Sequence, residues 1–255
     1  MEAMIERLKS LPGKTGFFYK NLETGETINW NENEKFIPAS VIKLPVMMAI
    51  FKMAERGEAD LYEKIRIRHE QKMPSCGALN SFTGEPEIDI LTLCSLMITI
   101  SDNTATNVLI SHFGTEKLNR EFAQMGLADT RVNRLLFDME ASKKGIQNCA
   151  TPKETAFLLE ELHSSRFVSE KVSEAIKEIL LRQQINHKIK EKLPPGTRAA
   201  HKTGEDDYIS NDAGIIYASQ PFIFSFFSND TKASEVNSFM RDAAAELFER
   251  CSEGR

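Results

Sequence analysis

The sequence lacks several features that would place it in specialised classes of protein. No stretch approaches the roughly 20 consecutive apolar residues that a membrane-spanning helix needs. Basic residues are not in excess, since 32 Lys and Arg stand against 37 Asp and Glu and give a net charge of −5, so nothing in the charge favours nucleic acid as a partner. The 4 cysteines are far apart and form no C-x-x-C pair, which excludes the usual zinc and thioredoxin patterns. Residues 1–10 are charged and show no apolar segment of a signal peptide. We therefore expect a cytoplasmic protein, or an exported one if a leader has been removed from the chain.

Strand patterns occur at both ends of the chain and helical patterns in between. Two hairpin strands are predicted at 16–20 and 26–30, and three further strands at 198–202, 211–219 and 222–228. Helices are predicted over 1–9, 41–53 and 232–250, and most of 60–190 is also helical in pattern. This order predicts an α/β fold with an antiparallel sheet of about five strands, flanked by terminal helices. We expect a discontinuous α/β subdomain of residues 1–45 and 193–255, a helical subdomain of 46–192, and a site in the cleft between them.

Three short motifs follow one another along the chain: Ser40-x-x-Lys43, Ser101-Asp102-Asn103 and Lys202-Thr203-Gly204. The first places a hydroxyl and an amine one helical turn apart, on the same face. A serine hydroxyl needs a neighbouring base to act as a nucleophile, and a desolvated lysine can be that base. Taken alone, the first motif is weak, because Ser40 in that place is also typical of a helix N-cap. The five histidines show no ligand spacing and suggest no catalytic triad.

The order of the three motifs resembles the penicillin-recognising serine hydrolases, and most closely the class A β-lactamase-like group. Residues 36–43 resemble the start of that family's nucleophile helix, and residues 97–110 its second-motif helix. Residues 201–204 and 211–216 resemble its third-motif strand and the strand after it. The similarity covers about residues 15–250. It implies a β-lactamase/transpeptidase-like fold, a β-lactam or peptidoglycan-like peptide as the small-molecule substrate, and no metal or organic cofactor.

The resemblance also implies a role for each motif residue. Ser40 is the nucleophile that becomes acylated, Lys43 takes or relays its proton, and Ser101 passes a proton to the leaving nitrogen. The residues expected to bind substrate are Asn103, Lys202, Thr203, Gly204 and Glu205. Within that set, Asn103 contacts the amide side chain of the substrate, and Lys202 and Thr203 hold its carboxylate. The backbone N–H groups of Ser40 and Glu205 form the oxyanion hole.

The loop after the second motif departs from the family pattern. Class A enzymes carry there a glutamate that activates the water for deacylation. Aligning Arg134 without gaps puts Leu136 at that position, and Asp138 and Glu140 follow two and four residues later. We take Glu140 as the candidate substitute base, with Asp138 as its alternative. The competing interpretation is that both are solvated carboxylates at a loop or helix start.

Three functions remain open from the sequence. The leading one is β-lactam hydrolysis through an acyl-enzyme on Ser40. The second is a penicillin-binding D-Ala-D-Ala peptidase or esterase that releases lactams slowly, because a site without a positioned base for water traps the acyl-enzyme. The third is a non-catalytic sensor of cell-wall peptides. How long acylated Ser40 persists separates the first two.

Overall fold

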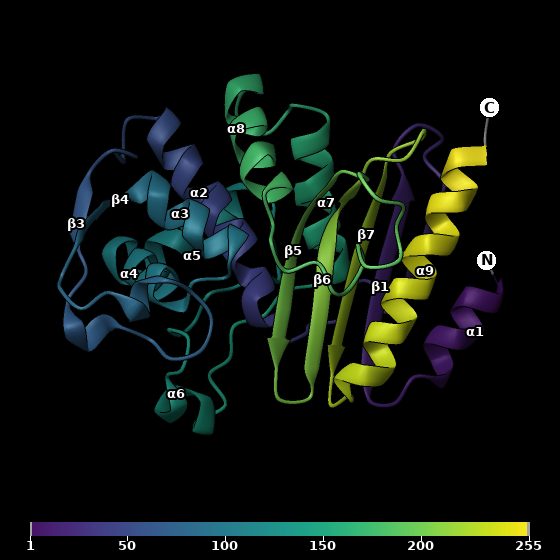
Figure 1. Ribbon diagram of the computed structural model, residues 1–255, viewed down its shortest axis with the longest axis horizontal. Coiled ribbons are helices and arrows are strands. Elements are labelled where there is room, and N and C mark those ends of the chain that lie inside the picture. The colour runs from purple at the N-terminus through teal and green to yellow at the C-terminus, as the bar shows by residue number, and fades with distance from the viewer. Residues whose placement is uncertain (1, 254–255) are drawn as a thin grey trace.

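A five-stranded antiparallel sheet organises the computed structural model, which describes residues 2–253, so Met1 of the first predicted helix lies outside the described residues (Figure 1). The strand order is β2-β1-β7-β6-β5. The bounds are β1 (Lys14–Asn21), β2 (Thr27–Trp30), β5 (Ala199–Asp206), β6 (Ile209–Ile216) and β7 (Phe222–Asn229). Because β1 pairs with β7 along its whole length, the two ends of the chain meet in the sheet. The prediction of about five antiparallel strands from both ends is confirmed.

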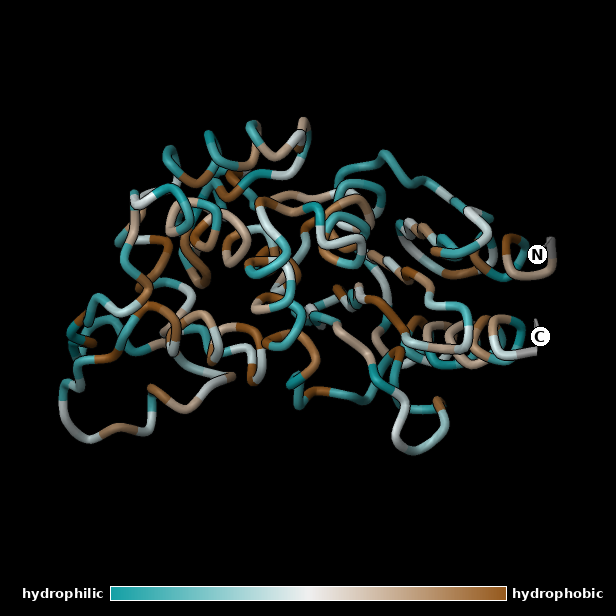
Figure 2. The backbone as a smooth tube through the Cα atoms, turned by 90° about the horizontal axis from the view of Figure 1, so that it is seen from above, coloured by the Kyte–Doolittle hydropathy of each residue, from teal (hydrophilic) through white to brown (hydrophobic). Residues whose placement is uncertain are grey.

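The two terminal helices cover one face of the sheet. These are α1 (Glu2–Ser10) and α9 (Ala233–Glu253), and Figure 2 shows the two ends of the chain beside each other. Strand β7 is apolar towards both faces. Its Phe222, Phe224 and Phe226 pack with α1 and α9, whereas Ile223 and Phe227 belong to the core on the other side. The sheet therefore separates two hydrophobic cores, and both of its faces are covered.

Helices fill the space between β2 and β5 in the chain. They are η1 (Ala39–Ile42), α2 (Lys43–Glu55), η2 (His69–Gln71), η3 (Leu79–Ser81), α3 (Ile90–Thr99), α4 (Asn103–Phe113), α5 (Thr115–Gln124), α6 (Met139–Lys143), α7 (Pro152–His163) and α8 (Glu170–Leu181). Helix α7 packs on β1, β6 and β7, and α8 packs on β5. The division at residues 45 and 193 stays a prediction. A small antiparallel pair, β3 (Lys64–Arg66) and β4 (Glu87–Asp89), interrupts the predicted helical stretch, because strands of three residues are too short to show periodicity.

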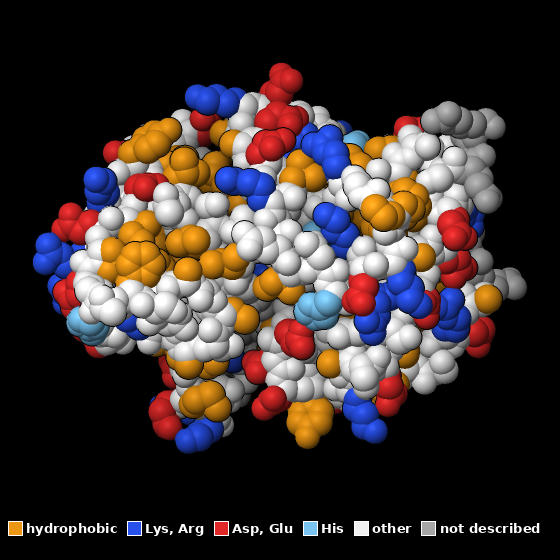
Figure 3. Space-filling model, viewed as in Figure 1, with side chains coloured by type: hydrophobic (Ala, Val, Ile, Leu, Met, Phe, Trp, Pro, Cys, Tyr) orange, Lys and Arg blue, Asp and Glu red, His pale blue; other side chains and the backbone are white. Residues whose placement is uncertain are grey.

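The surface mixes charges of both signs. Figure 3 shows Lys and Arg side chains interspersed with Asp and Glu over the visible face, as the small net charge of −5 leads one to expect. Over the described part of the chain, every helix is either too short or too polar to cross a membrane.

Candidate active site

Ser40 lies in a single 3₁₀ turn, η1, that leads directly into α2. The backbone N–H of Lys43 donates to Ser40 O, so the two residues are three apart in one turn, where side chains at i and i+3 lie one above the other. Pro38 flanks this turn without a side-chain capping bond, and Ile42 does the same for α2. The interpretation of Ser40 as an N-cap is therefore wrong, because Pro38 and Ile42 are the N-cap residues of η1 and α2.

The Lys43 amine is the centre of a buried polar cluster. Lys43 has no exposed surface, and its Nζ donates to Ser101 O at 2.9 Å, Ser101 Oγ at 3.0 Å and Asn103 Oδ1 at 2.9 Å. Lys202, also fully buried, donates from Nζ to the same Ser101 Oγ at 3.2 Å and to Thr203 O at 2.7 Å. The structure thus brings together Lys43, Ser101, Asn103 and Lys202 from three distant motifs. Because both lone pairs of Ser101 Oγ face amines, its own proton is free to be donated elsewhere.

Backbone strain accompanies this arrangement. Ser101 sits in the break between α3 and α4 with φ of +57°, in the left-handed region that residues with a Cβ rarely adopt. Ala39, directly before Ser40, has φ of +45°. Ser101 itself belongs to the second motif, and Ala39 adjoins the nucleophile of the first. The surrounding structure therefore holds two unfavourable backbone conformations at the motifs.

Burial lowers the pKa of both lysines. Burial, followed by the charge of Lys202, holds the pKa of Lys43 well below its ordinary value. Burial also lowers the pKa of Lys202 to about 7, although the nearby Asp212 opposes the shift. A lowered pKa favours the neutral form of an amine, which can accept a proton, as a base for Ser40 has to do.

The third motif touches the nucleophile turn through Gly204. A Cβ on Gly204 would lie 2.6 Å from Pro38 O and 3.2 Å from Ser40 N, so only glycine lets the edge strand β5 come this close. The next residue is Glu205, so the close approach brings its backbone towards Ser40 N. The backbone N–H groups of Ser40 and Glu205 are the two that the family resemblance assigns to the oxyanion hole. Thr203 lies between Lys202 and Gly204 and is 4% exposed.

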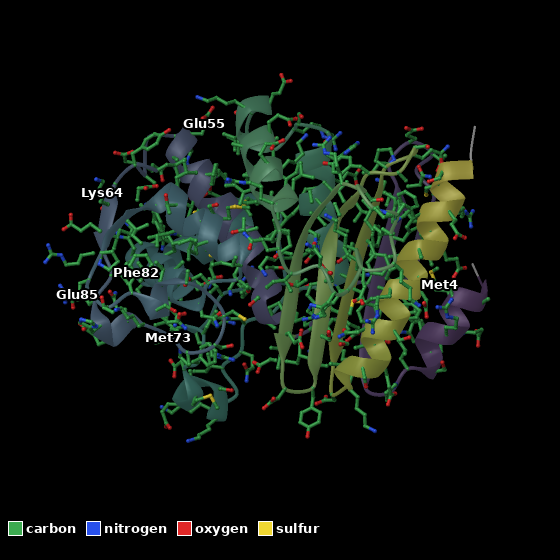
Figure 4. All side chains as sticks on the ribbon, in the orientation of Figure 1. Met4, Glu55, Lys64, Met73, Phe82 and Glu85 are labelled. Atoms are coloured by element: carbon green, nitrogen blue, oxygen red, sulfur yellow. The ribbon has the colours of Figure 1, made fainter. Side chains whose placement is uncertain are left out.

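Asp102 ties a loop over the second motif. Its Oδ1 accepts from Ala105 N at 2.9 Å and caps α4, while its Oδ2 accepts from Ala78 N at 2.7 Å and Leu79 N at 2.9 Å. Gly77 has φ of +122°, and a Cβ there would lie 2.4 Å from the Asp102 carboxyl. Figure 4 labels Met73, at the start of this loop, on the helical half of the molecule, across the sheet from Met4. Asp102 therefore has a structural role, because it connects the loop at residues 78 and 79 to the start of α4.

The residue held beside α4 by the following loop is Leu136. Asn107 lies one helical turn beyond Asn103 on α4, so both face the same side. Asn107 Oδ1 accepts from Leu136 N at 2.8 Å, and Asn107 Nδ2 donates to Leu136 O at 2.9 Å. These two hydrogen bonds fix the backbone of residue 136 beside Asn107, one helical turn beyond Asn103. That Leu136 stands at the position of the family's glutamate stays a prediction of the gapless alignment.

The two carboxylates of that loop have local partners. Asp138 Oδ1 accepts from Ala141 N at 2.9 Å and caps α6. Glu140 lies on α6 with its side chain 77% exposed and pairs with Lys143 Nζ at 3.1 Å. Neither carboxylate is hydrogen-bonded to the cluster of Lys43, Ser101, Asn103 and Lys202, so the structure does not bring the candidate base together with the other predicted site residues.

A second buried cluster behind β5 was missed from the sequence. Lys188, fully buried, donates to Gly204 O at 2.8 Å and Asn211 O at 3.3 Å, and its Nζ lies 3.3 Å from Glu205 Oε2. Burial lowers the pKa of Lys188, and the charge of Glu205 partly offsets this. His201 Nδ1 lies 3.0 Å from Asp212 Oδ1, and the alternation of side chains along β5 puts His201 on the strand face opposite Lys202. A lysine in the connection before β5 carries no pattern that marks it as buried.

Metal-binding groups and surface hollows were also sought among the side chains away from the motifs. Within residues 2–253, no group of three or more His, Cys, Asp or Glu side chains is placed to hold a metal ion. A surface hollow beside β3 contains none of the motif residues, since its lining is Glu63, Lys64, Ile65, Arg66, Arg68, Glu70, Gln71 and His112.

Comparisons with known proteins agree with the geometry. The model of the β-lactamase enzyme family matches residues 1–251. The curated β-lactamase CARB-3 of Pseudomonas aeruginosa is 25% identical over 231 residues, which cover 88% of this chain and 80% of that protein.

Solved structures agree over nearly the whole chain. A β-lactamase from Sphaerobacter thermophilus is 27% identical with a TM-score of 0.88 and covers 98% of this chain and 96% of its own. PBP-A is 26% identical with a TM-score of 0.89, covering 98% and 94%. The fold is therefore β-lactamase/transpeptidase-like, and the chain belongs to the β-lactamase enzyme family of serine hydrolases.

Proposed function

We propose that this protein is a serine acyl-transfer enzyme of the penicillin-binding type, which forms an acyl-enzyme on Ser40 and releases a lactam-derived acyl group slowly. Its own substrate is then a peptide or an ester of the D-Ala-D-Ala type. The observation that carries the proposal is the leucine at position 136, held beside α4 by Asn107 where the family's deacylating glutamate is expected. Without a carboxylate there, water has no positioned base, and the acyl group persists.

The proposed acylation uses Ser40 together with the polar cluster of Lys43, Ser101 and Lys202. The Ser40 hydroxyl attacks the carbonyl carbon and gives its proton to the Lys43 amine, whose lowered pKa favours the form that can accept it. The negative oxygen is stabilised by the N–H groups of Ser40 and Glu205. When the C–N bond breaks, Ser101 Oγ donates its proton to the nitrogen and recovers one from a lysine, since its Oγ lies 3.0 Å from Lys43 Nζ and 3.2 Å from Lys202 Nζ.

A relative supports this proposal. The L158E variant of PBP-A, with 26% identity and a TM-score of 0.89, is described as an acyl-enzyme complex with penicillin-G. Formation of such an adduct on Ser40 is the first step that we propose here.

The second candidate is β-lactam hydrolysis of the class A type. The 25% identity to CARB-3 of Pseudomonas aeruginosa and to ROB-1 of Haemophilus influenzae favours it. It requires Glu140 or Asp138 to leave its present partner and activate water.

Intact mass after incubation with a penicillin or a cephalosporin tests both candidates. We expect a stable adduct of one lactam per chain, no adduct on Ser40→Ala, and acylation about 10²- to 10⁴-fold slower on Lys43→Ala because the base is lost. Return to the unmodified mass within minutes supports the hydrolase instead. Absence of any adduct on the wild type, with the lactam left unconsumed in the mixture, overturns both and leaves the sensor.

A further inference from the structure

We propose that Lys188 is a positioning residue for the acylation of Ser40. From behind β5, its amine holds the peptide unit between Gly204 and Glu205, so that the Glu205 N–H stays aimed at the oxygen that becomes negative when Ser40 attacks. The inference rests on the proposed acylation, in which this N–H is one of the two hydrogen-bond donors of the oxyanion hole.

The Lys188 amine has three oxygen neighbours in the described structure. Lys188 has no exposed surface, and its Nζ donates to Gly204 O at 2.8 Å and to Asn211 O at 3.3 Å and lies 3.3 Å from Glu205 Oε2. Burial lowers the pKa of Lys188, and the charges of Glu205 and Asp212 oppose this shift. Both protonation states of the amine carry an N–H for Gly204 O, the nearest of the three oxygens. Lys188 therefore contacts the carbonyl before the Gly204–Glu205 peptide bond and the side chain after it.

The contact with Gly204 O determines where the Glu205 N–H points. In a trans peptide unit the C=O and N–H groups lie in one plane and point in opposite directions. Gly204 is paired with Asn211 of β6, and Lys188 Nζ bridges the carbonyl oxygens of both residues. The Glu205 N–H therefore points away from β6, towards the outer edge of β5, the last strand of the sheet. The turn η1 with Ser40 packs on this strand.

A second effect of the same hydrogen bond is on the strength of the N–H donor. An amide whose oxygen accepts a hydrogen bond is polarised, and its N–H becomes a better donor. A donor that is already oriented also stabilises the negative oxygen without having to turn during the reaction. The backbone next to Lys188 is itself anchored, because Ile189 N donates to the fully buried Asp212 at 3.3 Å. Lys188 therefore acts on the reaction through Glu205 N–H and without touching the substrate.

Acylation by benzylpenicillin tests this role when it is followed by intact mass over a range of lactam concentrations. The limiting rate and the half-saturating concentration are then obtained separately for the wild type and for Lys188→Met, which removes the N–H groups. We expect the limiting rate to fall about tenfold, less than the 10²- to 10³-fold that loss of an entire oxyanion donor costs. The half-saturating concentration should stay within twofold, because bound lactam has not yet formed the negative oxygen.

Lys177→Met is the matched control. Lys177 is another buried lysine, it lies on α8, and it is paired with Glu174. We expect its replacement to leave both acylation parameters within twofold of the wild type. Lys188→Gln keeps an N–H group without the charge, and we expect it to lower the limiting rate about threefold, because charge-assisted hydrogen bonds are the stronger ones. It gives the same test if Lys188→Met does not fold.

The infrared spectrum of the acylated protein gives a readout that is independent of the rates. Stronger hydrogen bonds to the ester carbonyl of the Ser40 adduct lower its stretching frequency. We therefore expect this band at higher wavenumber in Lys188→Met than in the wild type, with Lys188→Gln between them and Lys177→Met at the position of the wild type.

The outcomes separate this inference from the proposed function. An unchanged limiting rate in a folded Lys188 variant, or a rise in the half-saturating concentration alone, overturns the role of Lys188. An equal loss in Lys177→Met, or a slower acylation with an unshifted ester band, also overturns it, because Lys188 then acts only on general stability. No adduct on the wild type, with the lactam left unconsumed, overturns the proposed function itself.

Discussion

The two sides of the Ser40 site differ in how their polar groups are held. On the side of α4 and β5, the amines of Lys43 and Lys202 are fully buried and share Ser101 Oγ. On the side of the loop after α5, the residue fixed beside α4 is Leu136, and the nearby carboxylates serve α6. The buried amine cluster is therefore built without a hydrogen bond to either carboxylate of the loop after α5. This difference supports the proposal that this protein forms acyl-enzymes readily and hydrolyses them poorly.

Adding a base to the second side is expected to have the largest effect. Leu136→Glu puts a carboxylate at the position that Asn107 fixes through the backbone of residue 136. General base catalysis contributes typically 10²–10⁴-fold, so we expect release of the penicilloyl group to accelerate by about 10²-fold or more. The release rate is measured by intact mass after excess lactam is removed.

Leu136→Gln is the matched control for this change. It has the same size as glutamate without the charge, and we expect it to release the acyl group at the rate of the wild type. Equal rates in the Glu and Gln variants would show that hydrolysis is limited by something other than a missing base, and the contrast between the two sides would lose its explanation.

Removing an anchor from the first side is expected to lower stability. Asp102 is fully buried and accepts from three backbone N–H groups, and in Asp102→Asn at least one of them faces an NH₂ group. An unsatisfied buried group costs about 1–3 kcal/mol, and the loss of charge-assisted bonds adds to it, so we expect the free energy of unfolding to fall by about 2–4 kcal/mol. Urea unfolding measures this.

Asp89→Asn provides the comparison for Asp102. Asp89 caps α3 by accepting from Thr92 N at 2.8 Å and holds no second loop. Asn caps a helix about as well as Asp, so this change should cost a few tenths of a kcal/mol. Similar losses in both variants would mean that the bonds from Asp102 to residues 78 and 79 contribute little.

The motifs of the site could be predicted because each is defined by residues that are close together in the sequence. Ser40 and Lys43 lie within one turn, and Ser101 to Asn103 interrupt an apolar helix pattern. Gly204 could be identified as a site residue because it completes the motif that begins at Lys202. Each of these signals is contained in a few neighbouring residues, and the strands at both ends likewise follow from short patterns.

Features that depend on long-range contacts could not be predicted. Lys188 acquires its role because the connection before β5 packs on two strands and buries the amine against Gly204 O and Asn211 O. The role of Glu140 could not be predicted for the same reason. The sequence puts a carboxylate in the loop after the second motif but does not show which group it pairs with. Its pairing with Lys143, three residues on, is a side-chain choice that only packing decides.

The buried lysines of the first side predict a smaller effect, on the pH dependence of stability. Burial lowers the pKa of Lys202 from 10.5 to about 7, so between these values the unfolded chain binds more protons than the folded one, and stability rises with pH. Below about pH 7 both states are protonated and the cost of burial is fully present. From pH 7.0 to 8.5 we expect Lys202 to contribute about 1–2 kcal/mol of added stability.

Urea unfolding of the wild type and of Lys202→Met at both pH values measures that contribution. The gain should be smaller in the variant by this amount. Measurements stay below about pH 9, because burial raises the pKa of Tyr19 and Cys94, and these groups reverse the trend at higher pH. Equal slopes in both proteins would show that Lys202 keeps its proton when folded, and the amine cluster would then be far more polar than its burial indicates.

The smallest effect is expected from Glu140→Gln on the second side. The Glu140 side chain is 77% exposed and its ion pair with Lys143 lies at the surface, where such pairs contribute little. We expect the release rate of the penicilloyl group to stay within twofold of the wild type, measured beside Lys143→Met, which breaks the same pair and keeps the carboxylate. A release rate lowered tenfold or more by Glu140→Gln alone would identify Glu140 as the base that activates water. Both sides of the site would then be equipped for their steps, and the loop would have to move for hydrolysis to occur.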